Sequence, residues 1–426
     1  MGAPGERVVI IGQGYVGLGL AVRAVEVGHD VVAFDVDESR LLLLAGGESY
    51  VEDVSSDRVA GALVTGRFRP TASPADLADF DIAVITVQTP LRDGVPDLSF
   101  VEDAGRVVAS HLRPGACVVL ESTTYPGTTQ ELLAPLLEAG SGLRAGVDFH
   151  LGYSPERIDP GNETWTLVTT PKVVSGIDAP SLARVQAFYD TLVERTVAVR
   201  GTSEAELTKL LENTFRHVNI ALVNELAVFA ADLGIDVWEA IDAAATKPFG
   251  YLRFTPGPGV GGHCLPVDPT FLSWKVERGT GDRFRFVELA NEINARMPDY
   301  VVRRVTAGLA ARDVFLHRAR VLLVGLAFKA NTADARGSPA VRIAQLLVEA
   351  GAEVHAADPH VVSALLDLPG VGVSLVELTP AEVEAADAVV VVTDHAAFDF
   401  AMLRDHASYV LDTRHRVPAG TDVEYL

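Results

Sequence analysis

The stretch RVVIIGQGYVG, residues 7–17, decides the fold of the amino-terminal part of the chain. It opens with a short apolar run rich in β-branched residues, which is typical of a buried strand. Three glycines in the order Gly-x-Gly-x-x-Gly follow, and helical spacing then continues to a stop at Gly28. Gly12 permits the tight turn, Gly14 lets the backbone approach a pyrophosphate, and Gly17 lets the helix pack closely on the strand. The stretch therefore predicts a strand, a phosphate-binding turn and a helix.

A second strand follows in DVVAFDVD, residues 30–37, and Asp35 lies at its end. An acidic residue about 20 positions after the glycines completes the pattern of a dinucleotide site. Its carboxylate would accept hydrogen bonds from the adenosine ribose hydroxyls and repel a 2′-phosphate, so we expect NAD rather than NADP. Arg40 would weaken that preference. The alternative is a tight turn that binds no ligand.

The pattern continues as strands that alternate with helices as far as residue 200. Ligands bind such parallel sheets beyond the carboxyl ends of the strands, so the loops that follow later strands are expected to line the cofactor. This predicts an α/β fold with a doubly wound parallel sheet in residues 1–200. The further strands are expected at residues 81–87, 116–122 and 149–155, and the lining loops carry Thr89, Pro90, Ser122 and Thr123.

Residues 201–312 have a different, helical character. The segment from Ser203 to Gly234 is predicted to be one long helix, with Ser203 as its cap, Glu206 three residues later and Gly234 as its stop. Further helices are expected around residues 236–244 and 285–311. A segment rich in glycine and proline, residues 256–268, separates them.

The strand and helix alternation returns in residues 313–426. RVLLVGLAF, SPAVRIAQLLVEAG, AEVHAADP and ADAVVVVTDH predict a second Rossmann-like parallel sheet with its helices. This region has no Gly-x-Gly-x-x-Gly loop, so a second dinucleotide is not expected there.

Composition limits the classes of function. The chain has 426 residues, of which 48% are hydrophobic and 22% charged, and its formal net charge is −22 with a pI near 4.8. This describes a globular protein of two or three domains and disfavours nucleic acid and anionic lipid as partners. The sequence has no apolar run of about 18 residues and no recognisable signal peptide, so a membrane span is not expected. Two cysteines form no disulfide framework, and a cytoplasmic location is expected.

One of those two cysteines stands in the glycine-rich segment PGPGVGGHCLPVD, residues 256–268. Cys117 fits a buried strand position, whereas Cys264 lies among glycines that let a backbone fold closely around a ligand. His263, Cys264 and Asp268 do not make a zinc-binding set, so no metal is expected. A nucleophilic thiolate is the favoured interpretation of Cys264.

The long helix carries polar residues that could serve this thiol. Lys209, Asn213 and Asn224 project within an arc of about 60°, at roughly 100° per residue, and Arg216 falls on the same side. Two interpretations are open, a solvated face and a polar cavity. The surrounding apolar residues favour the cavity.

At this point the chain resembles the nucleotide-sugar 6-dehydrogenases, the family of UDP-glucose and UDP-N-acetylhexosamine dehydrogenases. The resemblance covers essentially the whole length, and its motifs occur in the family's order. It implies an NAD-binding Rossmann domain, a helical centre that forms a homodimer, and a carboxyl-terminal Rossmann-like domain for UDP. The motifs are GQGYVG, ESTTYPGTT, YSPERIDPGN, LTKLLENTFRHVNIALVNE, PGPGVGGHCLPVDP and GLAFKANTADARGSPA.

The resemblance also implies an oxidation in two stages at C6 of a UDP-hexose. A first hydride transfer to NAD gives an aldehyde, which Cys264 captures as a thiohemiacetal. A second hydride transfer gives a thioester, which water releases as the uronate. The thiol keeps the carbon in place between the two oxidations.

The roles that the resemblance implies are assigned position by position. Lys209 and Asn213 would stabilise the oxyanion at C6. Asp268 would assist the thiol and the hydrolytic water, and Glu156 would act on that water with Thr123 nearby. The cofactor positions implied are Gly12, Gly14, Tyr15, Val16, Gly17, Asp35, Arg40, Thr89, Thr123 and Arg336. The substrate positions implied are Glu156, Lys209, Asn213, Arg216, Asn224, Arg253, Gly261 and Lys329.

Three positions depart from the pattern of many UDP-glucose enzymes. Pro160 stands where a second acid is common, Val267 where a lysine is common, and Gly337 where a glutamate is common. The first two resemble the N-acetylhexosamine branch, and SPERIDPGN is most similar to the N-acetylglucosamine type. UDP-N-acetylglucosamine is therefore slightly favoured, UDP-glucose comes next, and UDP-N-acetylmannosamine is a further candidate.

Two other functions stay open at this stage. A two-electron dehydrogenase of the β-hydroxyacid type also pairs a Rossmann domain with a helical domain and uses a Lys-x-x-x-Asn face, but requires no cysteine. A non-catalytic sensor of nucleotide sugars would need neither Lys209 nor Cys264, so the presence of both disfavours it.

Overall fold

The computed structural model describes residues 5–51, 53–159, 162, 164–262, 264–361 and 372–426, apart from the side chain of Cys264. The chain forms two compact units. Unit 1 comprises Met1–Glu212 with Thr270–Asp282, and unit 2 comprises Asn213–Pro269 with Arg283–Leu426. Two helices, α7 (Thr202–Asp232) and α9 (Cys264–Thr280), contribute residues to both units.

Unit 1 is built on an eight-stranded sheet with the order β10-β9-β8-β7-β4-β1-β2-β3. All neighbours pair in parallel except β8 and β9, which are antiparallel. The strands are β1 (Arg7–Ile11), β2 (Asp30–Phe34), β3 (Phe68–Thr71), β4 (Ile82–Ile85), β7 (Cys117–Leu120), β8 (His150–Tyr153), β9 (Lys172–Gly176) and β10 (Thr196–Ala198). The predicted doubly wound parallel sheet is confirmed, and Cys117 lies buried on a strand as expected.

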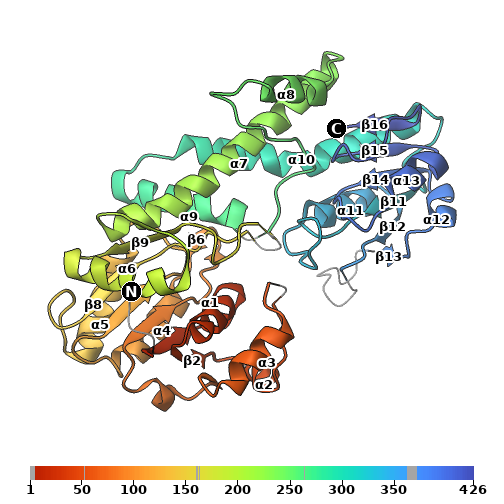
Figure 1. The fold of residues 1–426 in the computed structure, drawn as a ribbon. Helices are drawn as coiled ribbons and strands as arrows, with labels where there is room; N and C mark the ends of the chain where they lie inside the picture. The colour runs from red at the N-terminus through yellow and green to blue at the C-terminus, as the bar shows by residue number, and fades with distance from the viewer. Residues whose placement is uncertain (1–4, 52, 160–161, 163, 263, 362–371) are drawn as a thin grey trace. The chain divides into compact units, whose positions relative to one another are not determined.

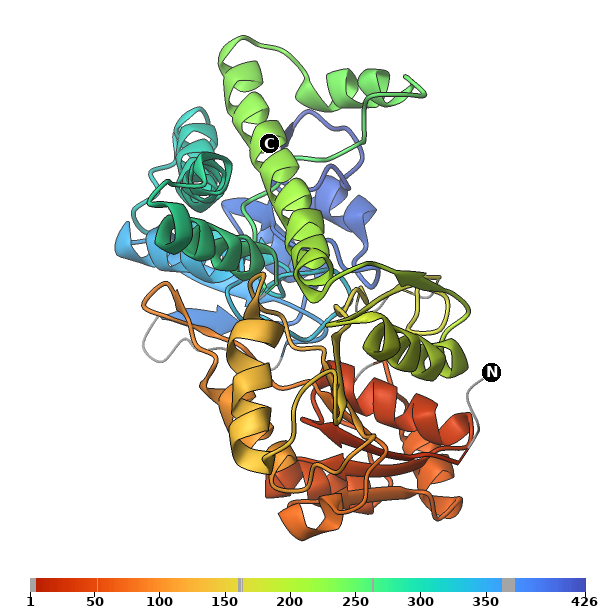
Figure 2. The ribbon, with the colours of Figure 1, turned by 90° about the vertical axis from the view of Figure 1, so that its left-hand side faces the viewer.

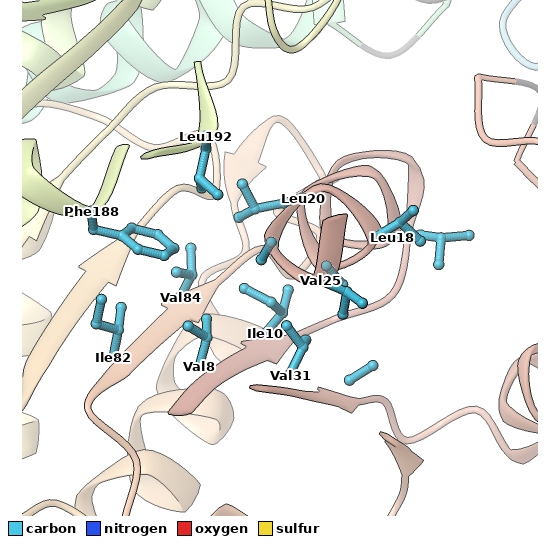
Figure 3. Close-up of a cluster of buried hydrophobic side chains, with 14 of the residues drawn as sticks. Val8, Ile10, Leu18, Leu20, Val25, Val31, Ile82, Val84, Phe188 and Leu192 are labelled. Atoms are coloured by element: carbon cyan, nitrogen blue, oxygen red, sulfur yellow. The ribbon is translucent and has the colours of Figure 1, made fainter. Parts of the chain in front are cut away.

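Helices cover both faces of this sheet because successive strand residues point to opposite sides. One face packs on α1, α3 and α6, and the other on α4 and α5. The elements other than the sheet are α1 (Tyr15–Glu26), α2 (Glu38–Ala45), α3 (Ser56–Val64), η1 (Pro74–Leu77), the β5 (Leu91–Arg92) and β6 (Val95–Pro96) hairpin, α4 (Ser99–Ala109), the π-helix η2 (Thr129–Leu133), α5 (Ala134–Ser141) and α6 (Ala179–Leu192). Figure 3 shows the first face, where Val8, Ile10 and Val31 of the sheet share one cluster with Leu20 and Val25 of α1 and Phe188 of α6.

Unit 2 contains a six-stranded sheet with the order β13-β12-β11-β14-β15-β16, in which every pair is parallel. One face packs on α10 and α11, and the other on α12 and α13. The second Rossmann-like sheet is therefore confirmed. Its elements are β11 (Arg320–Val324), α11 (Pro339–Glu349), β12 (Glu353–Ala357), β13 (Val373–Leu375), α12 (Pro380–Glu384), β14 (Ala388–Val391), α13 (Phe400–His406), β15 (Val410–Asp412) and β16 (Val423–Tyr425).

The helical middle of the chain comprises α7, α8 (Val237–Ala245), α9 and α10 (Arg285–Ala310). The light-green α7 is one continuous helix in both views (Figures 1 and 2), and it ends before Gly234, as predicted. The predicted cap is wrong. The helix begins at Thr202, and Glu206 hydrogen-bonds to residues of another loop instead of closing a capping box.

The glycine-rich segment also differs from its prediction as a loop up to residue 268. The helix α9 already begins at Cys264, with Pro266 near its start and Pro269 inside it. The glycines before it are packed within unit 2. A Cβ added at Gly261 would lie 2.8 Å from the carbonyl oxygen of Gly337, and one at Gly262 would lie 2.7 Å from the Phe328 ring. These glycines are required by a close approach of two backbone segments.

Among the helices that the structure describes, none is long and apolar enough to cross a membrane.

Candidate active site

The glycine turn after β1 has the geometry that the sequence predicted. Gly12 has φ +93°, a conformation that favours glycine. A Cβ added at Gly17 would lie 1.8 Å from the carbonyl oxygen of Gly12, so only glycine allows this helix to approach the turn. A Cβ added at Gly14 would have no described atom within 4 Å. The turn is thus closed by Gly12 and Gly17 and open at Gly14, which is where a pyrophosphate would approach the start of α1.

Asp35 lies directly after β2 and faces this turn. It is 6% exposed, its Oδ2 accepts a hydrogen bond from the Gln13 N–H at 2.6 Å, and its Oδ1 accepts one from the Asp37 N–H at 2.9 Å. Arg40 Nη1 lies 3.6 Å from Oδ2. The carboxylate therefore stands at the edge of the glycine turn, and this arrangement fits the ribose of a dinucleotide. Arg40 is close enough to offset part of its charge.

The remaining predicted cofactor positions in unit 1 are at the same carboxyl edge of the sheet. Tyr15 and Val16 open α1, and Thr89 is half-buried in the loop after β4. Sequence reasoning missed Thr86, which directly follows β4. Its Oγ1 donates hydrogen bonds to the carbonyl oxygens of Ile11 and Gly12, at 2.9 Å and 2.8 Å, and so ties the glycine turn to the neighbouring strand.

A buried lysine reaches the loop after β7. Lys209 of α7 is 8% exposed, and its Nζ donates a hydrogen bond to Thr123 Oγ1 at 2.5 Å. The interpretation of this helix face as solvated is thereby excluded for Lys209. A largely desolvated ammonium group at the carboxyl edge of a dinucleotide-binding sheet can stabilise negative charge on a reacting oxygen.

Glu206, one turn before Lys209, holds the same loop and was not predicted to do so. Its carboxylate accepts hydrogen bonds from the N–H groups of Gly127 and Thr129, at 2.5 Å and 2.8 Å, and from the Thr129 hydroxyl at 2.6 Å. The side chain is fully buried, and burial raises the pKa of Glu206 to about 7 despite these hydrogen bonds. The only signal in the sequence was its helical spacing from Lys209.

Glu156 lies in the loop after β8 and is 8% exposed. Its Oε1 accepts a hydrogen bond from the Ile158 N–H, and its Oε2 lies 3.7 Å from Nζ of Lys172. Lys172 is itself 4% exposed and forms an ion pair with Glu121, which is 1% exposed. Neither Lys172 nor Glu121 was singled out from the sequence. Pro160, the position where many relatives carry a second acid, lies outside the described residues.

In unit 2 the structure joins two other predicted residues. Asn213 Nδ2 donates a hydrogen bond to Asp268 Oδ2 at 2.6 Å, and Asp268 is 3% exposed. Cys264 opens the helix that carries Asp268. The side chain of Cys264 and the whole of His263 lie outside the described part, so the nucleophilic role of Cys264 stays a prediction.

Asn224 has a buried position with its hydrogen bonds directed to its own unit. Its Nδ2 donates to Asn294 Oδ1 at 2.9 Å, and its Oδ1 accepts from the Gly257 N–H at 2.9 Å. This amide fastens the start of the glycine-rich segment to the helices. Arg216 is exposed, and Arg253 is paired with Asp242 at 2.7 Å.

The carboxyl-terminal sheet carries the last three predicted positions. Lys329 is half-buried in the loop after β11, and Arg336 is exposed and hydrogen-bonded to Asp334 at 2.6 Å. Gly261 packs on this same loop through Gly337. The structure therefore brings Thr123 together with Lys209 in unit 1, and Asn213 together with Asp268 in unit 2.

Comparison with known families gives matches along most of the chain. Three models of one family match in order: the "UDP-glucose/GDP-mannose dehydrogenase family, NAD binding domain" over residues 6–193, its central domain over residues 203–296, and its UDP binding domain over residues 322–418.

Individual relatives match over similar lengths. A UDP-N-acetyl-D-mannosamine dehydrogenase of Pyrococcus horikoshii is 36% identical over 393 residues, which cover 92% of this chain and 90% of the relative. One of Salmonella typhimurium is 34% identical over 420 residues, covering 95% and 97%. The solved structure of the Pyrococcus horikoshii enzyme has a TM-score of 0.88 at 34% identity and covers 98% of both chains. A UDP-glucose dehydrogenase structure from Pyrobaculum islandicum has a TM-score of 0.87 at 28% identity, covering 99% and 97%.

Proposed function

The chain belongs to the UDP-glucose/GDP-mannose dehydrogenase family, and from that premise we propose that it oxidises the C6 hydroxymethyl group of a UDP-2-acetamido-hexose to a carboxylate. It is a nucleotide-sugar dehydrogenase with the family's NAD binding and UDP binding domains. The observation that carries the proposal is the buried Lys209, whose ammonium group contacts Thr123 beyond the carboxyl end of β7 in the NAD binding domain.

The cofactor supplies one kind of chemistry: NAD, when bound, accepts one hydride in each of two oxidations at C6. Gly12, Gly14 and Gly17 would hold its pyrophosphate at the start of α1, and Asp35 its adenosine ribose. These residues fit the group because the turn is open only at Gly14 and the carboxylate stands at its edge.

Cys264 carries the covalent part of the reaction. Its sulfur adds to the C6 aldehyde, so that a C–S bond forms while the carbonyl oxygen takes up a proton to give a thiohemiacetal. The second oxidation removes a hydride from the same carbon and the proton from its hydroxyl group, which leaves a thioester. Water then adds to the thioester carbon, the C–S bond breaks, and the sulfur leaves as thiolate.

Other predicted side chains are proposed to stabilise charge and move protons. Lys209 would stabilise the C6 oxyanion in each addition, because a positive charge in a site with little water interacts strongly with developing negative charge. Asn213 and Asp268 are supported as a pair by their 2.6 Å hydrogen bond. Glu156 would take the proton of the hydrolytic water as a general base. Lys329 and Arg336 are proposed contacts to the substrate and the cofactor.

The sugar is proposed from the relatives. UDP-N-acetyl-D-mannosamine ranks first because the similar proteins from Pyrococcus horikoshii and Salmonella typhimurium carry that name. UDP-N-acetylglucosamine, which the segment Ser154–Asn162 favoured in the sequence, and UDP-glucose follow.

Stoichiometry tests this function directly. With each of the three UDP-sugars, NADH absorbance and sugar consumption are measured together. Two NADH per sugar are expected for the true substrate. Cys264→Ala should stop uronate formation, whereas the exposed Lys247→Met should turn over like the parent chain. One NADH per sugar, or unchanged turnover of Cys264→Ala, would instead favour a two-electron dehydrogenase of the β-hydroxyacid type. Tight binding of a UDP-sugar without NADH would indicate a sensor.

We also propose that the protein is a homodimer through α7. Three large apolar side chains of this helix, and a fourth directly after its end, recur at helical spacing and are exposed: Leu222 by 53%, Leu226 by 47%, Phe229 by 56% and Leu233 by 72%. Such a stripe is typical of an interaction surface. Leu226→Glu should convert a dimer into a monomer in light scattering, whereas Val64→Glu, at one of the exposed valines of unit 1, should not. An unchanged mass of Leu226→Glu would exclude this surface.

A further inference from the structure

Three charged side chains lie buried side by side in unit 1. Glu121 follows β7, Glu156 follows β8 by three residues, and Lys172 opens β9. Their exposed fractions are 1%, 8% and 4%. Nζ of Lys172 contacts Oε1 of Glu121 and lies 3.7 Å from Oε2 of Glu156. Two carboxyl groups therefore share one ammonium group away from water.

The reversal of one strand produces this arrangement. β8 and β9 are antiparallel, and Gly152 pairs with Gly176 and Tyr153 with Ser175. Continued by three residues, the same register sets Glu156 opposite Lys172. Since β7 runs parallel to β8, Glu121 emerges at the same sheet edge. A parallel β9 would have carried its first residue to the opposite edge.

The two carboxyl groups are bound differently. Both oxygens of Glu121 have partners, because Oε1 meets Lys172 and Oε2 accepts a hydrogen bond from the Tyr189 hydroxyl at 2.7 Å. Burial raises the pKa of Glu121, Lys172 lowers it, and Glu156 raises it again. The net direction is upward. Burial therefore disfavours the ionised form of Glu121, and Glu121 and Glu156 both interact with the single ammonium group of Lys172.

Glu156 depends on that cation more than Glu121 does. Its Oε1 accepts the Ile158 N–H, but its buried Oε2 has no hydrogen-bond partner among the described residues. The adjacent Arg157 is committed elsewhere, to Glu212 at 2.6 Å and to the Pro171 carbonyl oxygen at 2.6 Å.

We propose that Lys172 is a positioning residue that keeps the Glu156 carboxylate ionised and directed for the hydrolytic step, with Glu121 as the counter-charge that limits its effect. The inference rests on the proposed function, in which Glu156 is the base that takes a proton from water. A carboxylate buried without a compensating charge would instead hold its proton and could not accept another.

The test is the pH dependence of thioester hydrolysis. It is measured in single-turnover experiments, with NADH absorbance for the oxidations and intact-protein mass for the covalent adduct. Lys172→Met should shift the acidic limb of the hydrolysis profile upward by about one to three pH units, because an opposite charge within a few ångströms has been removed. Glu121→Gln should shift it downward, because a like charge has been removed. Below the shifted limb, Lys172→Met should release two NADH per active site and then stall as the thioester.

Further variants separate positioning from folding. Lys172→Arg keeps the charge and should retain most of the wild-type profile. Lys172→Met leaves two buried carboxyl groups and could prevent folding. The double variant Lys172→Met/Glu121→Gln removes one charge of each sign, and its limb should lie between those of Lys172→Met and the wild type. The exposed Lys247→Met is the matched surface control and should leave the profile unchanged.

The outcomes distinguish the inference from the function beneath it. A wild-type chain that forms two NADH per sugar, with single variants whose limbs coincide with the wild-type limb, would overturn the role of Lys172 alone. If Lys172→Met does not fold, and the pH profile of hydrolysis in the folded double variant equals that of the wild type, the role of Lys172 is also overturned. A wild-type chain that forms no covalent adduct with any UDP-hexose would overturn the proposed function itself.

Discussion

Each of the two large sheets has an aspartate directly after its second strand in chain order, which is β2 in unit 1 and β12 in unit 2. The two aspartates make different hydrogen bonds. In unit 1, Asp35 follows β2 and accepts hydrogen bonds from the N–H groups of Gln13 and Asp37. In unit 2, Asp358 follows β12 and accepts four backbone hydrogen bonds, from residues 326, 327, 360 and 361, and one from His395 at 2.9 Å. His395 Nδ1 accepts a hydrogen bond from the Asn331 N–H, so Nε2 carries the hydrogen and donates the hydrogen bond to Asp358.

The difference teaches that the same position in a fold can lie beside an open turn or hold a long loop in place. The turn after β1 closes within three residues, and α1 begins at Tyr15. The loop after β11 runs through residues 325–338 before α11 begins, and Asp358 accepts hydrogen bonds from the N–H groups of Leu326 and Ala327 at its start. Asp358 has little hydrogen-bonding capacity left, whereas Asp35 stands beside an open turn.

The largest effect is expected from adding one methyl group to the glycine turn of unit 1, in the variant Gly17→Ala. Gly17→Ala would place a Cβ 1.8 Å from a backbone oxygen, so the turn or α1 must shift. We expect a loss of roughly 5 kcal/mol or more in the free energy of unfolding of unit 1 and no NAD binding. Gly14→Ala, whose Cβ meets nothing, should fold normally and only weaken NAD binding. Thermal unfolding and NAD titration would measure both, and equal stability of the two variants would refute the assignment of roles within the turn.

Exchanging each aspartate for asparagine compares the two positions directly. Asp358→Asn loses a buried charge that accepts five hydrogen bonds, and it should destabilise unit 2 by about 4 kcal/mol while NAD affinity is unchanged. Asp35→Asn should cost about 1 kcal/mol in stability but weaken NAD binding roughly tenfold. Denaturant unfolding and calorimetric NAD titration give the two numbers. The comparison fails if Asp35→Asn is the more destabilising variant.

The stabilities of the two units should also depend on pH in opposite directions. Burial raises the pKa of Glu206 from 4.5 to about 7, so the stability that its protonated form contributes to unit 1 is full below about 4.5 and is lost as pH rises through 7. Burial also raises the pKa of Asp358, but the hydrogen bonds from His395 and the backbone outweigh it and hold this pKa well below its usual range. Its contribution to unit 2 is therefore full above about 3.8 and is lost only as pH falls below that.

Hydrogen exchange resolves these two effects by segment. Between pH 5 and 7 the opening free energy of residues 125–133 should fall by about 2 kcal/mol, while that of residues 325–331 stays constant. Below pH 4 the second segment should weaken. A common slope in both segments would mean that neither carboxyl group controls its loop.

The strands and the position of Asp35 could be predicted from the local sequence pattern. The side-chain contacts between distant segments could not. The strands around Gly12 and Gly325 follow from apolar runs, and Asp35 follows from its spacing after the glycines. The pairing of Glu121 with Lys172 depends on an antiparallel register between β8 and β9, which no periodicity within either strand encodes. The start of α9 at Cys264 was hidden by Pro266, because a proline in the first turn of a helix reads in sequence as a loop.

The smallest effect concerns the departure at Gly337, in the long loop that distinguishes unit 2. Gly337 has φ +62°, and an added Cβ would come no closer than 3.7 Å to its neighbours, so space is not the constraint. The constraint is the left-handed backbone, which disfavours alanine by about 1 kcal/mol and asparagine by less. Gly337→Ala should therefore lower the free energy of unfolding of unit 2 by about 1 kcal/mol, and Gly337→Asn by roughly half of that. Both should change NAD affinity little, because the glycine turn and Asp35, which are proposed to hold the pyrophosphate and the adenosine ribose, lie in unit 1. A larger loss of turnover than of stability in Gly337→Ala would instead mean that this loop, through Arg336 beside it, takes part in the reaction.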